Sequence, residues 1–171
     1  AFWSALNHHG MTEQLPRTIF VATNHPVRYP PKETLGMTFK LVSLKPKKFF
    51  GLVRAWVDEQ PFWITDREKT IIDGLHLPQY VGGVGEIAKA LAGSWHELDE
   101  AKLRNYAVKF GSSAVVKRLG FLMETFHLGR ADLLRKAAPL AEGFPPLDPT
   151  LPKKGKHTIR WKLLINSEIA S

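Results

Sequence analysis

Hydrophobic positions in the first third of the chain follow patterns that are typical of β-strands. "RTIFVAT" (Arg17–Thr23) is an almost continuous apolar run, and "MTFKLVSL" (Met37–Leu44) alternates between apolar and polar residues. The proline-rich stretch between them, residues 24–36, predicts a loop.

A second pair of strands is predicted to form a hairpin. The runs "GLVRAWV" (Gly51–Val57) and "QPFWITD" (Gln60–Asp66) are separated only by Asp58 and Glu59. A two-residue connection is typical of β-hairpins, although the favoured connections contain glycine.

Helical spacing of apolar residues begins the chain and returns after residue 65. In "AFWSALNHHG", an apolar stripe precedes Gly10, so the chain is expected to begin inside a core-facing helix. Thr65 and Glu68 have the spacing of a capping box, which predicts the start of a helix with Ile71, Ile72 and Leu75 facing inward. Further helical stripes comprise Val84, Ile87, Ala88, Leu91 and Trp95; Leu103, Tyr106, Ala107 and Phe110; Val115, Leu119, Leu122 and Phe126; and Leu133, Leu134, Ala137 and Leu140.

Two breaks divide the second half of the chain. Gly111, followed by Ser112 and Ser113, predicts that one helix stops and another starts. "GFPPLDPTLPKKGK" (residues 143–156) ends the helical part, and "TIRWKLLIN" (Thr158–Asn166) predicts a last strand that returns to the sheet.

The order of these elements predicts an α+β fold. We expect a mainly antiparallel sheet of about four to five strands, a cluster of about five helices and a closing C-terminal strand. Residues 1–171 are interpreted as a single domain, with a sheet-rich part (1–65), a helical part (66–142) and a basic loop with the last strand (143–171).

Composition narrows the classes of function. The absence of cysteine excludes disulfides, thiolate nucleophiles and cysteine zinc sites. No apolar run approaches the roughly 20 residues of a membrane span, and the first residues do not resemble a secretion signal. We therefore expect a cytoplasmic protein without membrane contact, metal or cofactor.

Charge is unevenly distributed along the chain, whose formal net charge is +8. Residues 1–57 carry eight Lys/Arg against two Asp/Glu, and residues 143–171 carry five against two, whereas residues 58–111 carry six against nine. Basic ends favour a polyanionic partner, with nucleic acid preferred over membrane because no helix combines a basic face with a strongly apolar one. A merely solubilising basic surface is the alternative.

Two lysine-rich stretches are the candidate nucleic-acid contacts. "KPKKFF" (45–50) and "KKGKHTIR" (153–160) each lie in a predicted loop beside a strand, where the side chains can reach phosphates. The candidate residues are Lys45, Lys47, Lys48, Lys153, Lys154, Lys156 and Arg160.

Other candidate chemistry is weaker. Side chains of His8 and His9 would point about 100° apart on a helix, which does not suit a shared metal. Asp66, Glu68 and Lys69 resemble a nuclease site only superficially, because such a site needs an acid and a lysine two residues apart on one strand face. "GGVGE" (82–86) could present backbone donors to a phosphate, but a tight turn explains it better.

Five stretches that are spread over nearly the whole chain form a recognisable ordered set. They are "FWSALNHHGMTEQLPRTIFVAT", "KPKKFFGL", "ITDREKTIIDGLHLPQYVGGVGEIAKAL", "AVVKRLGFLMETF" and "RWKLLIN". This set closely resembles the C-terminal region of AbiEi-type antitoxins, which are transcriptional regulators of phage defence systems.

The resemblance implies a non-enzymatic domain of an antitoxin that represses its own operon. In that family a winged helix-turn-helix domain precedes this region, and the partner toxin is a nucleotidyltransferase of a type IV system that the antitoxin opposes without stable direct binding. The implied partner is operator DNA, bound mainly by the winged-helix domain, while self-association on DNA stays open. Two other hypotheses are a metal-dependent nuclease and a protein-binding module that uses an apolar patch around Phe49, Phe50, Trp56 or Trp63.

Overall fold

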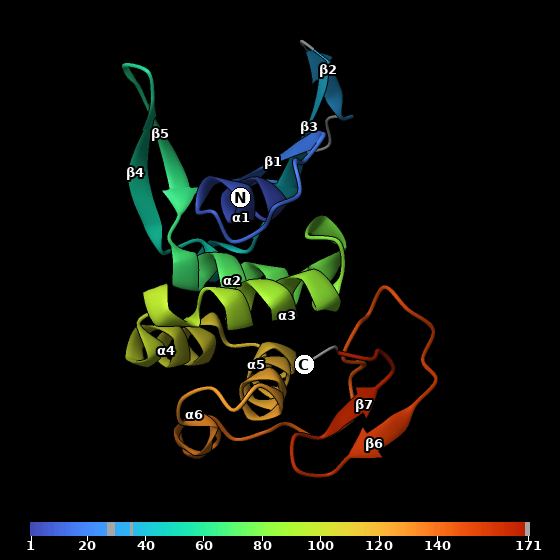
Figure 1. The fold of residues 1–171 in the computed structure, drawn as a ribbon. Helices are drawn as coiled ribbons and strands as arrows, with labels where there is room; N and C mark the ends of the chain where they lie inside the picture. The colour runs from blue at the N-terminus through green and yellow to red at the C-terminus, as the bar shows by residue number, and fades with distance from the viewer. Residues whose placement is uncertain (27–29, 35, 170–171) are drawn as a thin grey trace.

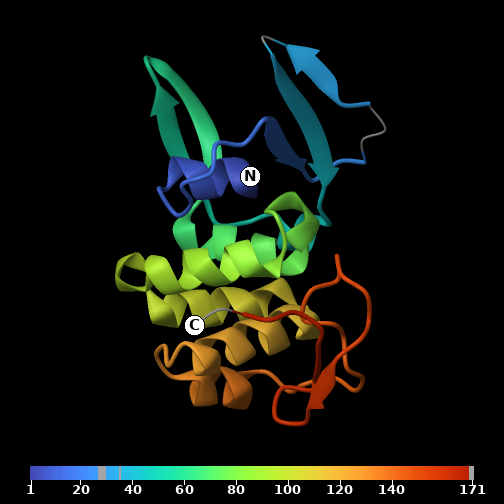
Figure 2. The same ribbon diagram turned by 45° about the vertical axis from the view of Figure 1, so that its right-hand side comes forward.

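A computed structural model describes residues 1–26, 30–34 and 36–169 and confirms the α+β class (Figure 1). Two β-structures stand as separate arms on one side of a layer of helices, and a small C-terminal hairpin packs on the other side (Figure 2). Three of the four strand pairings are antiparallel, but the strands form three separate sheets rather than one.

The first arm is a three-stranded sheet. It contains β1 (Thr18–Thr23), β2 (Lys32–Thr34) and β3 (Met37–Ser43) in the order β1-β3-β2. β1 and β3 are parallel, because the long connection between them lets the chain return to the start of β1. The prediction of a loop over residues 24–36 is wrong for β2, while residues 27–29 and 35 of that loop lie outside the described residues.

The second arm is the predicted hairpin. β4 (Leu52–Val57) pairs with β5 (Gln60–Thr65) in antiparallel register, with Val57 opposite Gln60. Asp58 has a φ of 51°, the left-handed conformation that a tight turn requires and that aspartate tolerates better than most residues. The hairpin prediction is therefore confirmed.

The helical layer is organised around α2 (Arg67–His76). Ile71, Ile72 and Leu75 are fully buried, as predicted, and Gly74 lets α3 approach closely, because a Cβ there would lie 2.3 Å from Ile87. The remaining helices are α1 (Trp3–His8), α3 (Val84–Gly93), α4 (Glu100–Phe110), α5 (Ser113–Thr125) and α6 (Ala131–Ala137), with short 3-10 helices η1 (Pro46–Lys48), η2 (Pro78–Tyr80) and η3 (Trp95–Glu97).

The predicted capping box at the start of α2 is wrong. Asp66 is the N-cap residue, and its Oδ1 accepts a hydrogen bond of 2.8 Å from the backbone N–H of Lys69. Thr65 remains in β5, where its hydroxyl lies 2.8 Å from that of Thr70. Aspartate caps at least as well as threonine does, and because β5 extends through Thr65, the next residue takes the capping position.

The break between α4 and α5 is confirmed. Gly111 adopts the left-handed conformation, with φ 69° and ψ 34°, and ends α4. Ser112 is the N-cap residue of α5, although its side chain makes no capping hydrogen bond.

The last strand does not return to the sheet, so that prediction is wrong. β7 (Leu163–Ile165) pairs with β6 (Lys156–Thr158), and the hairpin is held against α5 by the buried Trp161. Gly120 makes this contact possible, because a Cβ there would lie 2.1 Å from the Trp161 ring. Burial of a large aromatic ring on the helix thus takes the place of further strand pairing.

Buried residues of the three-stranded arm, the helices and the C-terminal hairpin belong to one hydrophobic cluster. Over the described part of the chain, no helix has the length and apolar character needed to cross a bilayer.

Candidate functional site

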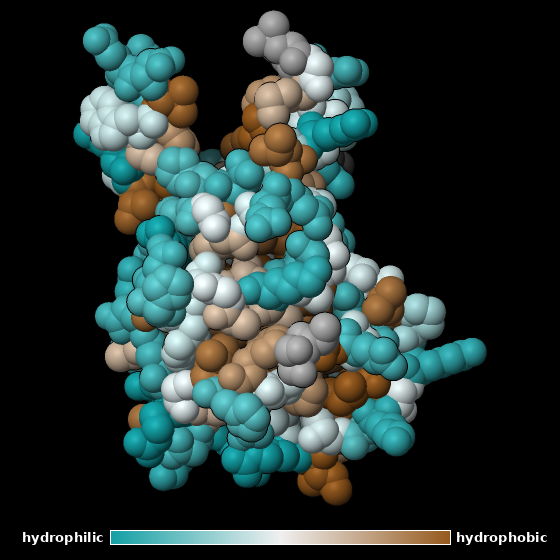
Figure 3. Space-filling model, viewed as in Figure 1, coloured by the Kyte–Doolittle hydropathy of each residue, from teal (hydrophilic) through white to brown (hydrophobic). Residues whose placement is uncertain are grey.

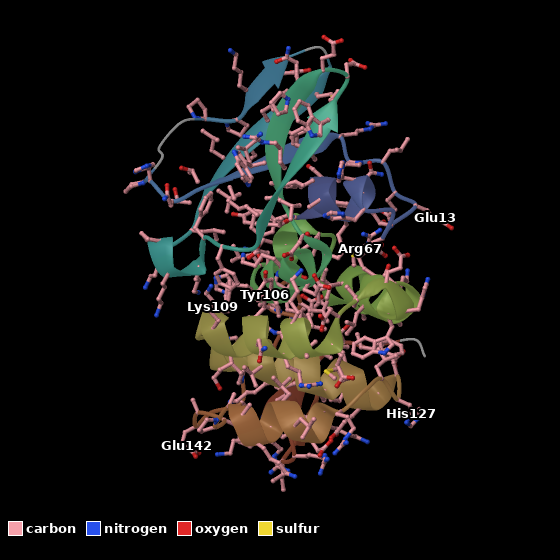
Figure 4. All side chains as sticks on the ribbon, turned by 90° about the vertical axis from the view of Figure 1, so that its left-hand side faces the viewer. Glu13, Arg67, Tyr106, Lys109, His127 and Glu142 are labelled. Carbon is pink, nitrogen blue, oxygen red and sulfur yellow. The ribbon has the colours of Figure 1, made fainter. Side chains whose placement is uncertain are left out.

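Three of the predicted basic residues form a compact group at η1, and the fold adds a fourth. Lys45, Lys47 and Lys48 lie at η1, and Lys109 at the end of α4 lies beside them (Figure 4). The Lys109 Nζ is 4.5 Å from the ring centroid of Phe50, the second residue after η1, which is the distance of a cation–π contact. We call these four residues the η1 basic cluster.

Lys48 is the most constrained member of this cluster. Its Nζ lies 4.7 Å from the ring centroid of Phe110 and donates a 3.0 Å hydrogen bond to Nε2 of His76. Burial, followed by the charge of Lys48, lowers the pKa of His76 to about 4, so its imidazole is neutral at pH 7 and can accept this bond. Burial and the charges of Lys45 and Lys47 lower the pKa of Lys48.

Within the part of the chain that the structure describes, acidic side chains do not neutralise the positive charge of the η1 basic cluster. Among the residues that the structure describes, no carboxylate forms an ion pair with any of its four lysines. Like charges that are held together on aromatic rings repel one another, and binding an anion relieves this repulsion.

The N-terminus of α5 lies next to this cluster. The Lys47 Nζ is 4.0 Å from the position that a Cβ would take at Gly111, the C-cap residue of α4, which is followed by Ser112, the N-cap residue of α5. The helix dipole places partial positive charge at this end, and the first backbone N–H groups of a helix lack partners within it. Together these features suit a phosphate group.

The C-terminal basic residues lie in a different part of the fold. Lys153, Lys154 and Lys156 are exposed in and before β6, and none has a carboxylate partner in the described ranges. Arg160 is engaged, because its Nη2 lies 2.6 Å from Oε1 of Glu124 on α5. Three of these four predicted residues are therefore free to contact a phosphate, whereas Arg160 would first have to break its ion pair with Glu124.

Asp66 and Glu68, the acids of the nuclease hypothesis, connect α2 to α4. Asp66 Oδ2 accepts a 3.0 Å hydrogen bond from the Tyr106 hydroxyl, and Lys102 lies 3.1 Å from Asp66 and 2.9 Å from Glu68. Glu68 also accepts a hydrogen bond from the backbone N–H of Asp99. Although burial acts in the opposite direction, the hydrogen bonds to Glu68 and Asp66 raise the pKa of Lys102. Both carboxylates are thus engaged in packing two helices.

The two histidines of the first helix face different surroundings. His9 Nε2 lies 2.6 Å from the backbone carbonyl of Thr65, and burial lowers the pKa of His9. His8 packs edge-to-face against Phe62 of the hairpin. Within the described ranges, no group of three or more His, Asp or Glu side chains has the arrangement of a metal site.

The glycine turn before α3 holds a carboxylate of the chain itself. Asp148 Oδ2 accepts a 2.8 Å hydrogen bond from the backbone N–H of Val84, the first residue of α3. A phosphate at this helix start would have to displace Asp148, so the turn interpretation of residues 82–86 accounts for the sequence.

An apolar cavity of about 740 Å³ lies between the two arms. Its walls come from α1, β1, β5 and the segment that precedes β4, and the side chains of Lys69 and Asp73 on α2 reach it from below. In the view of Figure 3 the arms stand apart, with hydrophobic side chains beside the gap. Lys69 and Asp73 are almost completely buried and form an ion pair with each other.

The hairpin arm carries exposed aromatic residues. Trp56 is 58% and Trp63 63% exposed, and the Arg54 guanidinium lies 5.4 Å from the Trp63 ring centroid. Phe49 and Phe50, which belong to the same predicted apolar patch, are half-buried and line the cavity, and Trp63 contributes to the cavity wall as well. The predicted patch is thus divided between an exposed surface and an interior wall.

The sequence did not indicate two of these features. Lys109 joins the η1 basic cluster only through the packing of α4, and Asp73 reaches the cavity only because α2 lies beneath both arms. A lone lysine on a helix face and a lone aspartate among apolar residues carry no local motif, although Asp73 is an unusual residue in a stripe otherwise predicted to be buried.

Comparison with the models of known protein families and with curated proteins gives no match to this chain.

Proposed function

We propose that this chain is a non-enzymatic regulatory domain that contacts the DNA backbone through the η1 basic cluster and, secondarily, through Lys153, Lys154 and Lys156. The observation that carries the proposal is a group of four neighbouring lysines without carboxylate partners in the described part of the chain, beside the N-terminus of α5. Lysines that contact phosphates fix the position of a protein on DNA without reading its sequence.

The wider role that we propose follows from the resemblance to AbiEi-type antitoxins. In this role the domain supports an autoregulatory repressor in the cytoplasm and opposes a nucleotidyltransferase toxin without forming a stable complex with it. Sequencing the DNA on both sides of the coding region tests the proposal. We expect a winged-helix segment upstream and a nucleotidyltransferase gene downstream, and two unrelated neighbours would contradict the antitoxin role.

The test of DNA contact compares three charge variants of equal net charge. One carries Gln at Lys45, Lys47 and Lys109, and a second carries Gln at Lys153, Lys154 and Lys156. The matched control carries Gln at Lys89, Arg130 and Lys136, which are exposed but paired with carboxylates. Binding to one duplex is measured by fluorescence anisotropy at low salt.

We expect the wild-type chain to bind any duplex with a dissociation constant on the order of 10⁻⁴ to 10⁻⁶ M, as non-specific complexes do. The first variant should lose the most affinity, the second less, and the control least. Equal losses of affinity in all three variants would show that only the net charge of the protein matters. If no variant lost affinity, the proposed contact with DNA would be wrong.

A second candidate is a protein-binding surface on the hairpin, favoured by the exposure of Trp56 and Trp63. Replacing both with Ser should abolish association with a partner protein while leaving DNA affinity unchanged. Association through apolar area is also less sensitive to salt than phosphate contact is. A DNA affinity that depends on the two tryptophans would contradict this division of roles.

A further inference from the structure

Asp73 is an unusual residue for the floor of an apolar cavity. It lies on α2, is fully buried, and lines the cavity together with Lys69. Its Oδ1 is bonded to the Lys69 ammonium group, whereas its Oδ2 has no hydrogen-bond partner among the described protein atoms. A buried carboxylate oxygen without a partner is costly, which makes it a natural acceptor for a ligand donor.

The cavity walls above Lys69 and Asp73 are mostly apolar and aromatic, and therefore suit an apolar ligand. Phe20, Phe49, Phe50, Phe62 and Trp63 all line the cavity and offer flat ring surfaces. The cavity volume of about 740 Å³ lies in the range of small-molecule sites, which combine apolar walls with a few polar groups.

Charge balance restricts the head group of the ligand. Lys69 already neutralises Asp73, and burial lowers the pKa of the Ala1 amino group at the cavity wall to about 6, so that group is mostly neutral at pH 7. A ligand with its own charge would therefore bring an uncompensated charge into an apolar site. The Lys69 Nζ is further occupied by the rings of Phe50 and Phe110, at 5.0 and 5.3 Å from their centroids. A neutral hydrogen-bond donor is therefore what Asp73 Oδ2 can accept.

We propose that this cavity binds an uncharged aromatic or aliphatic molecule with a single hydroxyl or N–H donor, which bonds Asp73 Oδ2 while its apolar body lies among the aromatic walls.

A matched series of probes tests the chemistry on the wild-type chain. 2-Naphthol has the donor, 2-methoxynaphthalene has the same ring system without it, and 2-naphthoate adds a negative charge. Isothermal titration calorimetry should show one site for 2-naphthol, about tenfold weaker binding of the methoxy compound, and the weakest binding for the carboxylate. Equal affinities for 2-naphthol and 2-methoxynaphthalene would show that Asp73 accepts no hydrogen bond from the ligand. If no probe bound, the proposed site would be wrong.

Two variants locate the bound probe. Ala22→Phe fills the cavity from β1 without touching the buried ion pair, whereas Val53→Phe adds the same ring to β4 at an exposed position that does not line the cavity. Loss of 2-naphthol binding is expected only for Ala22→Phe. Retained binding in that variant would place the probe elsewhere and overturn the proposal.

Asp73→Asn tests the acceptor directly, since it removes the carboxylate charge and should reduce the preference for 2-naphthol over 2-methoxynaphthalene. This variant leaves Lys69 buried without its partner and can fail to fold. The probe series and the Ala22→Phe comparison decide the proposal in that case. An unchanged preference in a folded Asp73→Asn variant would overturn it.

Discussion

Asp66 combines three interactions in one side chain. It caps α2 through the N–H of Lys69, accepts from the Tyr106 hydroxyl and pairs with Lys102. Asp99 provides a matched case, because it caps α4 through the N–H of Lys102 but is exposed. We predict that Asp99→Ala lowers the free energy of unfolding by about 1 kcal/mol, and that Asp66→Ala lowers it by about 2 kcal/mol or more.

Urea denaturation of both variants at pH 7 measures the difference. Equal losses would show that the contacts of Asp66 with α4 add nothing to its capping role.

His76 gives a prediction about pH. Burial and the neighbouring Lys48 hold its folded pKa at about 4, below the value of about 6.5 in an unfolded chain. Between these two pKa values the unfolded chain binds more protons, so the free energy of unfolding falls as pH falls from 6.5 to 4. One proton limits this slope to about 1.4 kcal/mol per pH unit, and partial exposure keeps it below that limit.

Comparison with His76→Asn isolates this residue, because His9, whose pKa is also lowered, stays present in both proteins. As pH falls from 7 to 4.5, the free energy of unfolding of the wild type should fall by more than that of the variant. Parallel stability curves from pH 7 to pH 4.5 would contradict the assigned pKa.

At the residue level, the sequence predicts those features that depend on residues close to one another along the chain. The Gly111 stop and the inward side of α2 depend on neighbouring residues and were predicted. The N-cap was misplaced by one position because Thr65 and Asp66 are both good caps, and only the extent of β5 decides between them.

At the scale of elements, the contact between α5 and the C-terminal hairpin gives the sharpest prediction. Trp161 packs so closely on Gly120 that a Cβ would lie 2.1 Å from the ring. Gly120→Ala should therefore destabilise the protein by about 1–3 kcal/mol despite the better helix propensity of alanine. Gly85→Ala in α3, where a Cβ meets nothing within 4 Å, should instead stabilise it by up to about 1 kcal/mol.

Thermal unfolding of the two variants provides the comparison. If Gly120→Ala were neutral or stabilising, the hairpin would not be held on α5 by this contact.

Local pattern predicted the elements better than their pairing. The β4–β5 hairpin was predicted because two residues connect its strands, and the helices followed from their apolar spacing. The short strand β2 was not predicted because it lies next to prolines. The last strand pairs with β6 because Trp161 anchors that hairpin. Such pairings depend on contacts between distant segments, which a single sequence does not encode locally.

At the scale of the whole molecule, the structure separates two surfaces of different chemistry. The η1 basic cluster lies at the ends of α2 and α4, whereas the apolar cavity opens between the arms. The lysine-rich stretches could be predicted as candidates because their residues are adjacent in sequence. The contribution of Lys109, the engagement of Arg160 by Glu124 and the cavity itself required the fold.

The central claim is that the η1 basic cluster contacts DNA phosphates, and the salt dependence of DNA binding measures this most directly. Binding of one duplex is measured across a salt series for the wild type and for the variant with Gln at Lys45, Lys47 and Lys109. Each phosphate contact contributes about 0.9 to the slope of log K against log salt concentration, so the variant should lose more than about 2 from that slope. Equal slopes for the two proteins would contradict the claim.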